Sequence, residues 1–150
     1  MSLVRELTDS DKSQWDPLWQ GYLQFYETKL SQEQSELTWK RLLDPTYNLH
    51  CLVAVLEGKI EGITHYSFQT STWAPNSYVY LEDLFVSPNV RGKGLGRLLI
   101  DAVKDIAISN KSSRLYWNTD ATNETARKLY DSYSLESGKV QYRIPLNTSD

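Results

Sequence analysis

The spacing of apolar and polar residues predicts alternating strands and helices throughout the 150-residue chain. Short runs rich in β-branched and aromatic residues are typical of strands, and apolar residues recurring every three to four positions are typical of helices. Strands are predicted at residues 4–8, in a hairpin within 50–70, and at 78–86, 113–120 and 138–146. Helices are predicted at residues 9–28, from 31 to the Asp44-Pro45 pair, and at 96–109 and 121–134. This order predicts one mixed α/β domain over residues 1–150.

The first predicted helix carries an aromatic stripe. Trp15, Trp19, Tyr22 and Tyr26 follow one another at spacings of four, three and four. This spacing places the four rings on one helical face. Most of the stripe is expected to pack in the core, where it gives this helix its buried side.

The charge balance narrows the classes of partner. The chain has 16 Lys and Arg against 19 Asp and Glu, for a net charge of −3. Such a balance offers no broad basic surface for a phosphate backbone, so no nucleic-acid partner is expected, whereas a cationic partner suits it. One cysteine and two histidines form no metal-ligand pattern, so no metal is expected. The sequence shows no apolar signal segment and no membrane-length run, so a cytoplasmic protein without membrane contact is expected.

A glycine-rich stretch, RGKGLGR at residues 91–97, stands between a predicted strand and a predicted helix. Glycine permits positive φ and close backbone approach, and the free N–H groups at a helix start favour an anion such as phosphate. The spacing G-x-G-x-G fits neither the dinucleotide fingerprint nor the P-loop. Arg91, Lys93 and Arg97 add positive charge, which suits a ligand with several phosphates. The alternative is a plain glycine-rich turn with charged surface residues.

Two motifs together resemble one family. The loop at residues 91–96 matches the R/Q-x-x-G-x-G/A loop of the GCN5-related N-acetyltransferases (GNAT), and it follows a strand as in that family. A second match, to the N-x-x-A-x-x-L-Y helix of the family, comes from Asn123, Ala126, Leu129 and Tyr130. The resemblance covers essentially the whole chain and is nearest to the fungal histone and polyamine acetyltransferases and the spermidine/spermine and thialysine acetyltransferases. It implies a central, mostly antiparallel twisted sheet, splayed at strands 4 and 5 and flanked by helices.

The resemblance also implies the acetyl donor, acetyl-coenzyme A. The pyrophosphate would lie on the N–H groups of residues 92–97, and the pantetheine arm would pair with the backbone of the strand at 78–86. Tyr116 and Trp117 would border the other side of the cleft. The residues expected to bind coenzyme A are Leu84, Phe85, Val86, Arg91, Gly92, Lys93, Gly94, Leu95, Gly96, Arg97, Asn118, Asn123, Ala126 and Tyr130.

Acetyl transfer to an amine requires a base for the ammonium proton and an acid for the leaving thiolate. We expect Glu82 to be the base, because burial beside apolar neighbours raises the pKa of a carboxyl group. We expect Tyr130 to be the acid, as the family uses the tyrosine at this motif position. Packing beside Leu129 is the alternative role for Tyr130, and Tyr133 is a weaker rival for the acid.

The other polar residues near these positions are expected to be structural. In a regular strand Asp83 points away from the face that Glu82 occupies, so hydrogen bonds to a neighbouring loop or helix start are its expected role. His50 and His65 lie in the hairpin strands, where either is a possible base but packing is the more usual role. Cys51 is expected to belong to the core, which leaves direct transfer without an acyl-enzyme as the simpler mechanism.

The acceptor is expected to be a small cationic molecule with a primary amine, such as a polyamine, a diamine or an amino acid. Glu27, Trp73 and Glu82 are the expected acceptor contacts, because carboxylates and ring faces attract cations. Two alternatives stay open, acetylation of lysines in proteins or histone tails and a non-catalytic acyl-coenzyme A-binding module. The family resemblance also implies a homodimer.

Overall fold

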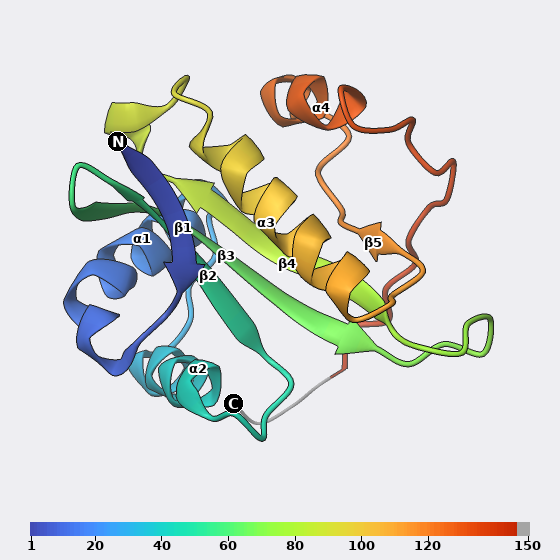
Figure 1. The fold of residues 1–150 in the computed structure, drawn as a ribbon, viewed down its shortest axis with the longest axis horizontal. Helices are drawn as coiled ribbons and strands as arrows, with labels where there is room; N and C mark the ends of the chain where they lie inside the picture. Colours follow the sequence, from blue (N-terminus) through green and yellow to red (C-terminus); the bar gives the residue numbers. More distant parts are fainter. Residues whose placement is uncertain (147–150) are drawn as a thin grey trace. The chain divides into compact units, whose positions relative to one another are not determined.

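The computed structural model describes residues 1–146, which fall into two compact units, one covering Met1–Asn118 and the other beginning at Thr119. The first unit contains a five-stranded sheet whose spatial order, β1-β2-β3-β4-β5, is also its order along the chain (Figure 1). The strands are β1 (Ser2–Glu6), β2 (His50–Leu56), β3 (Lys59–Gln69), β4 (Tyr78–Val86) and β5 (Leu115–Tyr116). Its helices are η1 (Asp9–Asp11), α1 (Lys12–Phe25), α2 (Gln32–Leu43), η2 (Pro88–Val90) and α3 (Leu95–Ser109).

The sheet is mostly antiparallel. The pairs β1–β2, β2–β3 and β3–β4 are antiparallel, and β5 joins β4 in parallel. The predicted hairpin is confirmed, and its turn contains Glu57 and Gly58 at φ 50° and 78°. The prediction of a mixed α/β fold with a mostly antiparallel sheet is therefore confirmed for the described residues.

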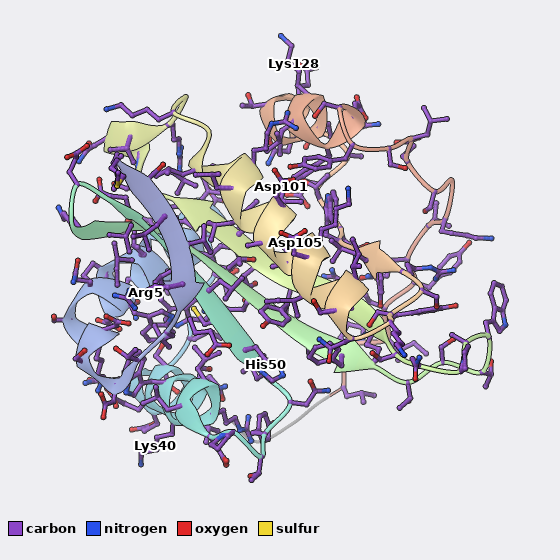
Figure 2. The ribbon with its side chains drawn as sticks, in the orientation of Figure 1. Arg5, Lys40, His50, Asp101, Asp105 and Lys128 are labelled. Carbon is purple, nitrogen blue, oxygen red and sulfur yellow. The ribbon has the colours of Figure 1, made fainter. Side chains whose placement is uncertain are left out.

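Helices cover both faces of the sheet. On one face Leu99 of α3 contacts Gly62 of β3, and on the other Trp15 of α1 donates a hydrogen bond to His65 of the same strand. The amphipathic spacing of α3 explains its position, because it buries Leu99 and Val103 while Asp101 and Asp105 face outward (Figure 2). The face under α1 is the one that carries the candidate chemistry.

The aromatic stripe of α1 forms the centre of the core on that face. Trp15 is fully buried, Trp19 stacks on it with ring centroids 5.9 Å apart, and Tyr22 stacks on Trp19 at 5.5 Å. Tyr26 continues the series at 4.8 Å from Tyr22 and is partly exposed. The predicted core role is confirmed for the first rings, while Tyr26, one residue beyond the end of α1, lies at the surface.

Strand β4 contains a β-bulge at Glu82. Asp83 pairs with His65 and Leu81 pairs with Tyr66, so Glu82 has no partner in β3. A bulge disturbs the alternation of side chains along a strand. The regular strand assumed for Glu82 and Asp83 in the sequence is therefore not what this region forms.

The contact between β4 and β5 is short. Only Val79 and Tyr80 of β4 pair with β5, although the sequence predicts a strand over residues 113–120. Beyond Tyr80, β4 has no strand on this side within the described residues. This is the splay between strands 4 and 5 that the family resemblance implies.

The second unit contains α4 (Glu124–Asp131), and the strand predicted at residues 138–146 is absent from it. Alternating apolar residues form a strand only where a neighbour supplies hydrogen bonds, and none pairs with this segment in the described chain. Its apolar members are exposed instead: Val140, Tyr142, Ile144 and Leu146.

Candidate active site

The carboxylate of Glu82 lies among groups that raise its pKa. Partial desolvation is the largest cause, and the negative charge of Asp83 adds to it. The residue is exposed to solvent, whereas the sequence predicts burial beside apolar neighbours. A carboxylate that is accessible and more basic than usual is suited to accept a proton from an approaching amine.

Two tyrosines lie within electrostatic reach of Glu82. Burial raises the pKa of Tyr22 on α1, and the charge of Asp83 and a hydrogen bond to it raise that pKa further. Desolvation and then the charge of Glu82 raise the pKa of Tyr80 on β4, against a hydrogen bond with Asn118. Both phenols therefore stay protonated at neutral pH and are available as hydrogen-bond donors beside the carboxylates.

Asp83 is tied to the neighbouring strand and not to a loop or helix start. Its carboxylate lies 2.9 Å from Nδ1 of His65, and its backbone carbonyl accepts a hydrogen bond of 2.8 Å from the Thr64 hydroxyl. The expected structural role fits these contacts, while the expected partners were wrong. Because of the bulge, the charge of Asp83 acts on Glu82 directly, so the two acids are not independent.

The two histidines occupy opposite faces of the sheet. His50 begins β2 (Figure 2), and its ring stacks on Tyr66 with centroids 5.1 Å apart. Burial lowers the pKa of His50. His65 is on the α1 face beside Asp83, with its side chain only 2% exposed. His50 is therefore separated from Glu82 by the sheet, and His65 is enclosed in the core.

The glycine-rich loop has the backbone geometry of an anion site. Gly92 and Gly94 have φ of 86° and 80°, which side-chain-bearing residues rarely adopt, and a Cβ at either position would meet nothing within 4 Å. Gly94 is the N-cap of α3, and no side chain caps this helix start. The start of α3 therefore lacks a side-chain cap, and the helix dipole there favours a negatively charged group.

Arg91 turns away from this loop toward the end of β4. Its Nε donates to the carbonyl of Val86 at 3.1 Å, and its guanidinium carbon lies 5.4 Å from the ring centroid of Phe85 and 5.9 Å from that of Phe25. These contacts fix the exit of β4 where the loop begins. A direct contact between Arg91 and a phosphate stays a prediction.

The end of β4 combines a buried face with an open edge. Phe85 is 8% exposed and packs against Gly21 of α1, whereas Leu84 and Val86 are half-buried. These three residues lie beyond the last pairing with β5. Their backbone groups on that side are therefore available to an extended ligand, as the predicted pantetheine arm requires.

Residues after β5 border the same edge. The rings of Tyr80 and Tyr116 are 5.1 Å apart, and the hydroxyl of Tyr116 donates to the side chain of Gln69. Asn118 forms a hydrogen bond with Tyr80. The structure thus brings Asn118 into the group around Glu82, through a residue that the sequence did not single out.

The second motif has a local structural explanation in the second unit. The side chain of Asn123 accepts a hydrogen bond of 3.2 Å from the N–H of Ala126 and so caps α4. Tyr130 lies on the same helix and is half-buried. Roles for Asn123, Ala126 and Tyr130 in cofactor binding or proton transfer stay predictions.

The expected acceptor contacts Glu27 and Trp73 are not brought together. Glu27 follows α1, whose last residue, Phe25, contacts Arg91 beyond the end of β4. Trp73 is 81% exposed in the loop before the start of β4. Trp73 therefore precedes the start of β4, whereas the end of α1 that leads to Glu27 contacts Arg91 beyond the other end of this nine-residue strand. Their contact with an acceptor stays a prediction.

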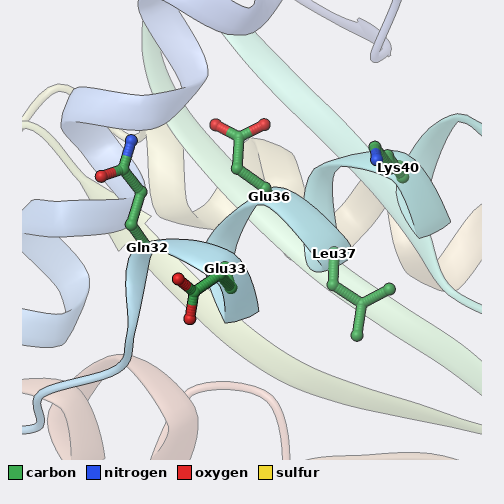
Figure 3. A pocket seen from close by; sticks show the side chains of 5 residues that line it. All are labelled: Gln32, Glu33, Glu36, Leu37 and Lys40. Carbon is green, nitrogen blue, oxygen red and sulfur yellow. The ribbon is translucent and has the colours of Figure 1, made fainter.

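Two surface hollows lie outside the group around Glu82. One is lined by five side chains of α2 alone (Figure 3): Gln32, Glu33, Glu36, Leu37 and Lys40. The other, about 510 Å³, lies between α1 and the ends of β3 and β4 and includes Phe25, Glu61, Phe85 and Arg91. Neither hollow includes Glu82. The candidate base therefore lies outside both hollows, at the bulge of β4.

Neither a metal site nor a membrane-spanning helix is found among the described residues. No group of three or more His, Cys, Asp or Glu side chains is arranged to hold a metal ion within residues 1–146. Among the helices that the structure describes, none combines the length and apolarity needed to cross a membrane.

Sequence reasoning missed several polar residues. Tyr22 and Tyr80 surround the carboxylates, and His65 holds Asp83, but their proximity depends on strand register and helix packing. Thr119 was also missed, and among the described residues its hydroxyl is the only buried side-chain oxygen or nitrogen without a hydrogen-bond partner. Only Tyr80 carried a usable sequence signal, since it lies two residues before Glu82 in the same strand.

Comparisons with known proteins show which family this chain resembles. The sequence profile of the Acetyltransferase (GNAT) family matches residues 8–133. The D-amino-acid N-acetyltransferase HPA3 of Saccharomyces cerevisiae is 32% identical over 143 residues, which cover 94% of this chain and 89% of the yeast protein. The thialysine N-epsilon-acetyltransferase of Mus musculus is 37% identical over 87 residues, covering 49% of this chain and 51% of the mouse protein.

Solved structures support the fold. The aminoglycoside acetyltransferase AAC(6')-Iy, in complex with a bisubstrate analog, has a TM-score of 0.84 at 17% identity, covering 98% of this chain and 99% of the other. At this identity the likeness concerns the fold alone. The profile match over most of the chain and the yeast relative together show that the chain belongs to the GNAT family and is an N-acetyltransferase.

Proposed function

We propose that the protein transfers an acetyl group from acetyl-coenzyme A directly to the primary amine of a small cationic acceptor, with Glu82 as the base. The observation that carries this proposal is the placement of Glu82 at the β4 bulge, with a raised pKa and contact with solvent. An alkylammonium has a pKa of about 10, so it must lose a proton before it can attack a thioester. Glu82 attracts the cation and accepts that proton, directly or through a water molecule.

The residues present fit the proposed donor. The open space beside Gly92 and Gly94 and the uncapped start of α3 suit its pyrophosphate, with Lys93 and Arg97 adding positive charge. The backbone of Leu84, Phe85 and Val86 suits its extended arm, because β4 is unpaired there. When bound, acetyl-coenzyme A supplies the activated acetyl group. The backbone N–H groups near the bulge are suited to stabilise negative charge on the carbonyl oxygen.

Tyr130 is the proposed acid. Its phenol gives a proton to the departing sulfur, which leaves coenzyme A as a neutral thiol. The support is its position in the N-x-x-A-x-x-L-Y motif, whose Asn123 caps α4. Tyr133, three residues later, provides the matched comparison.

The acceptor class is supported by charge and by the relatives. Glu82 and Asp83 place two carboxylates in one region, which favours a cation, and the rings of Tyr22 and Tyr80 lie beside them. The named relatives act on D-amino acids and on thialysine. We therefore place amino acids and short diamines ahead of proteins as acceptors, with Glu27 and Trp73 as further proposed contacts.

The assembly and location are also proposals. A homodimer accounts for the exposed apolar residues of the segment 138–146, because a second copy can cover them. A cytoplasmic location is likewise a proposal.

The experiment that tests the function is a panel of acceptors. Release of free coenzyme A is measured with acetyl-coenzyme A and with D- and L-amino acids, thialysine, polyamines and basic peptides. We expect turnover with at least one small amine, and a higher kcat/KM for it than for any peptide. Tight binding of coenzyme A without turnover of any amine contradicts the proposal and favours a non-catalytic binding module. Preference for peptides contradicts only the acceptor class.

A further inference from the structure

His65 connects the core to the bulge through both of its ring nitrogens. On one side Nε2 accepts a hydrogen bond of 3.1 Å from the indole N–H of Trp15, whose side chain is fully buried. On the other side Nδ1 lies 2.9 Å from a carboxylate oxygen of Asp83. The chain Trp15–His65–Asp83 therefore runs from α1 through β3 to β4.

The donor chemistry of this chain fixes the proton on His65. An indole nitrogen can only donate, so Nε2 must offer its lone pair, and the single ring proton belongs to Nδ1, which donates to Asp83. Burial lowers the pKa of His65, but the charges of Cys51 and Asp83 and hydrogen bonds to both residues outweigh burial and raise this pKa to about 10, which by itself favours a protonated ring. The indole of Trp15 acts against a second ring proton. A proton on Nε2 of His65 would point at the indole N–H, and two N–H donors would then face each other at 3.1 Å. The hydrogen-bond geometry at Nε2 therefore favours a neutral ring over an imidazolium.

Asp83 is held on several sides. Besides Nδ1 of His65, it accepts a hydrogen bond from Tyr22, and its backbone carbonyl accepts one from Thr64. The next residue toward the N-terminus is Glu82, which has no partner in β3. A residue without a cross-strand partner is positioned by its neighbours, and here the neighbour is fixed by buried contacts.

We infer that His65 is a positioning residue: as a neutral Nδ1–H imidazole held by Trp15, it fixes Asp83 and thereby the bulge that presents Glu82. This inference rests on the proposed role of Glu82 as the base, but the state of His65 can be measured without any activity. It also gives Asp83 a defined task, since its carboxylate accepts the hydrogen bond from Nδ1–H of His65 next to Glu82. Trp15 is a core residue, and in this arrangement its indole also determines which nitrogen of His65 carries the proton.

The groups facing His65 come from each element packed against it. They are Trp15 and Trp19 from α1, Cys51 from β2 and Asp83 from β4, with Glu82 acting through its charge. Only the indole N–H of Trp15 excludes a proton on Nε2. Removing it should therefore change the titration of His65, while removing the indole of Trp19, which donates to Ser35, should not.

The first test is ¹⁵N NMR of the imidazole between pH 5.5 and 8.5. In the native protein we expect a protonated Nδ1 and an unprotonated Nε2 throughout. In Trp15→Phe we expect His65 to gain a proton within this range, because Asp83 remains while the opposing donor is gone. Trp19→Phe is the matched control and should behave like the native protein. An imidazolium or an Nε2–H tautomer in the native protein, or no change in Trp15→Phe, would overturn the inference.

The second test concerns the position of Glu82. The carboxyl titration of Glu82, followed by ¹³C NMR, should be kept in His65→Gln, whose amide offers one donor and one acceptor, and altered in His65→Leu. Acetyl transfer should follow the same order, with kcat near native in His65→Gln and lower in His65→Leu at similar KM for acetyl-coenzyme A. If His65→Leu folds and keeps both the titration and kcat, the positioning role is refuted. If no variant transfers acetyl groups but the titrations behave as expected, only the proposed function fails.

Discussion

The carboxylate of Asp83 lies 2.9 Å from Nδ1 of His65, and this cross-strand pair adjoins the bulge that leaves Glu82 unpaired. The two adjacent acids thus occupy different environments. Asp83 is bonded to its neighbours, and Glu82 keeps contact with solvent and is influenced by the charge next to it.

This relationship predicts a pH effect. Glu82 acts as a base only when ionised, so kcat/KM should fall as the pH drops through its raised pKa. Asp83→Asn removes one cause of the raised pKa, and the acidic limb of the pH profile should then move to lower pH while desolvation still acts. The pH profile of kcat/KM in Asp83→Asn is compared with that of the native protein. Ionisation of the amine acceptor affects the two profiles equally, so a difference between them comes from the protein.

Asp105→Asn is the control for this shift. It also removes one negative charge, but from the outward side of α3 on the other face of the sheet (Figure 2). Its profile should match the native one. An unmoved acidic limb in Asp83→Asn, or equal shifts in both variants, would show that Asp83 does not set the pKa of the base.

The loop glycines allow a test of the proposed donor site. Gly94→Ala places a side chain at φ 80° in the start of α3, and we expect weaker binding of coenzyme A by calorimetry. Gly58→Ala introduces similar backbone strain at φ 78° in the β2–β3 turn. Each variant should lose about 1–2 kcal/mol of unfolding free energy. Only Gly94→Ala should lose affinity, and an equal loss in both would remove the loop from the binding site.

The proposed acid is tested by removing one hydroxyl. Tyr130→Phe should lower kcat by about 10²-fold, at the lower end of the range for general acid–base catalysis, with little change in coenzyme A affinity. Tyr133 lies two residues after the end of α4, and the kcat of Tyr133→Phe should stay close to that of the native protein. Reversed effects would exchange the roles of the two tyrosines, and full activity in Tyr130→Phe would leave the acid unassigned.

The exposed segment 138–146 predicts self-association. Light scattering of the native protein should give the mass of a dimer, because a second copy buries Val140, Tyr142 and Ile144. Replacing Tyr142 and Ile144 by Asp should give a monomer, since a charge in an apolar interface is costly. Replacing the exposed Ile108 of α3 by Asp is the control. A native monomer would refute the proposed homodimer.

Much of the fold follows from local patterns. The hairpin around Gly58 and the helices at 12–25, 32–43 and 95–109 were predictable, because turn chemistry and helical periodicity are local properties. The strand at 138–146 was wrongly predicted, although Val140, Tyr142, Ile144 and Leu146 alternate. Alternation states which face is apolar, but pairing requires a neighbouring strand that the sequence does not specify.

The candidate site also contains parts that local sequence predicts and parts that it does not. Glycine at 92 and 94 identified the loop, since positive φ favours this one residue type. The bulge at Glu82 and the contact of Asp83 with His65 were not predictable, because they depend on register between positions 18 residues apart. The raised pKa expected for Glu82 is present, but its exposure and the effect of the Asp83 charge on it became visible only in the structure.

The most direct test of the account is the activity of Glu82→Gln. With the best small amine of the panel, kcat/KM should fall by about 10²–10⁴-fold, the usual contribution of a general base. Affinity for coenzyme A should be unchanged, and the acidic limb of the pH profile should disappear. Glu57→Gln, which alters an exposed carboxylate in the β2–β3 turn, should retain native activity. Native activity in Glu82→Gln would contradict the assignment of the base.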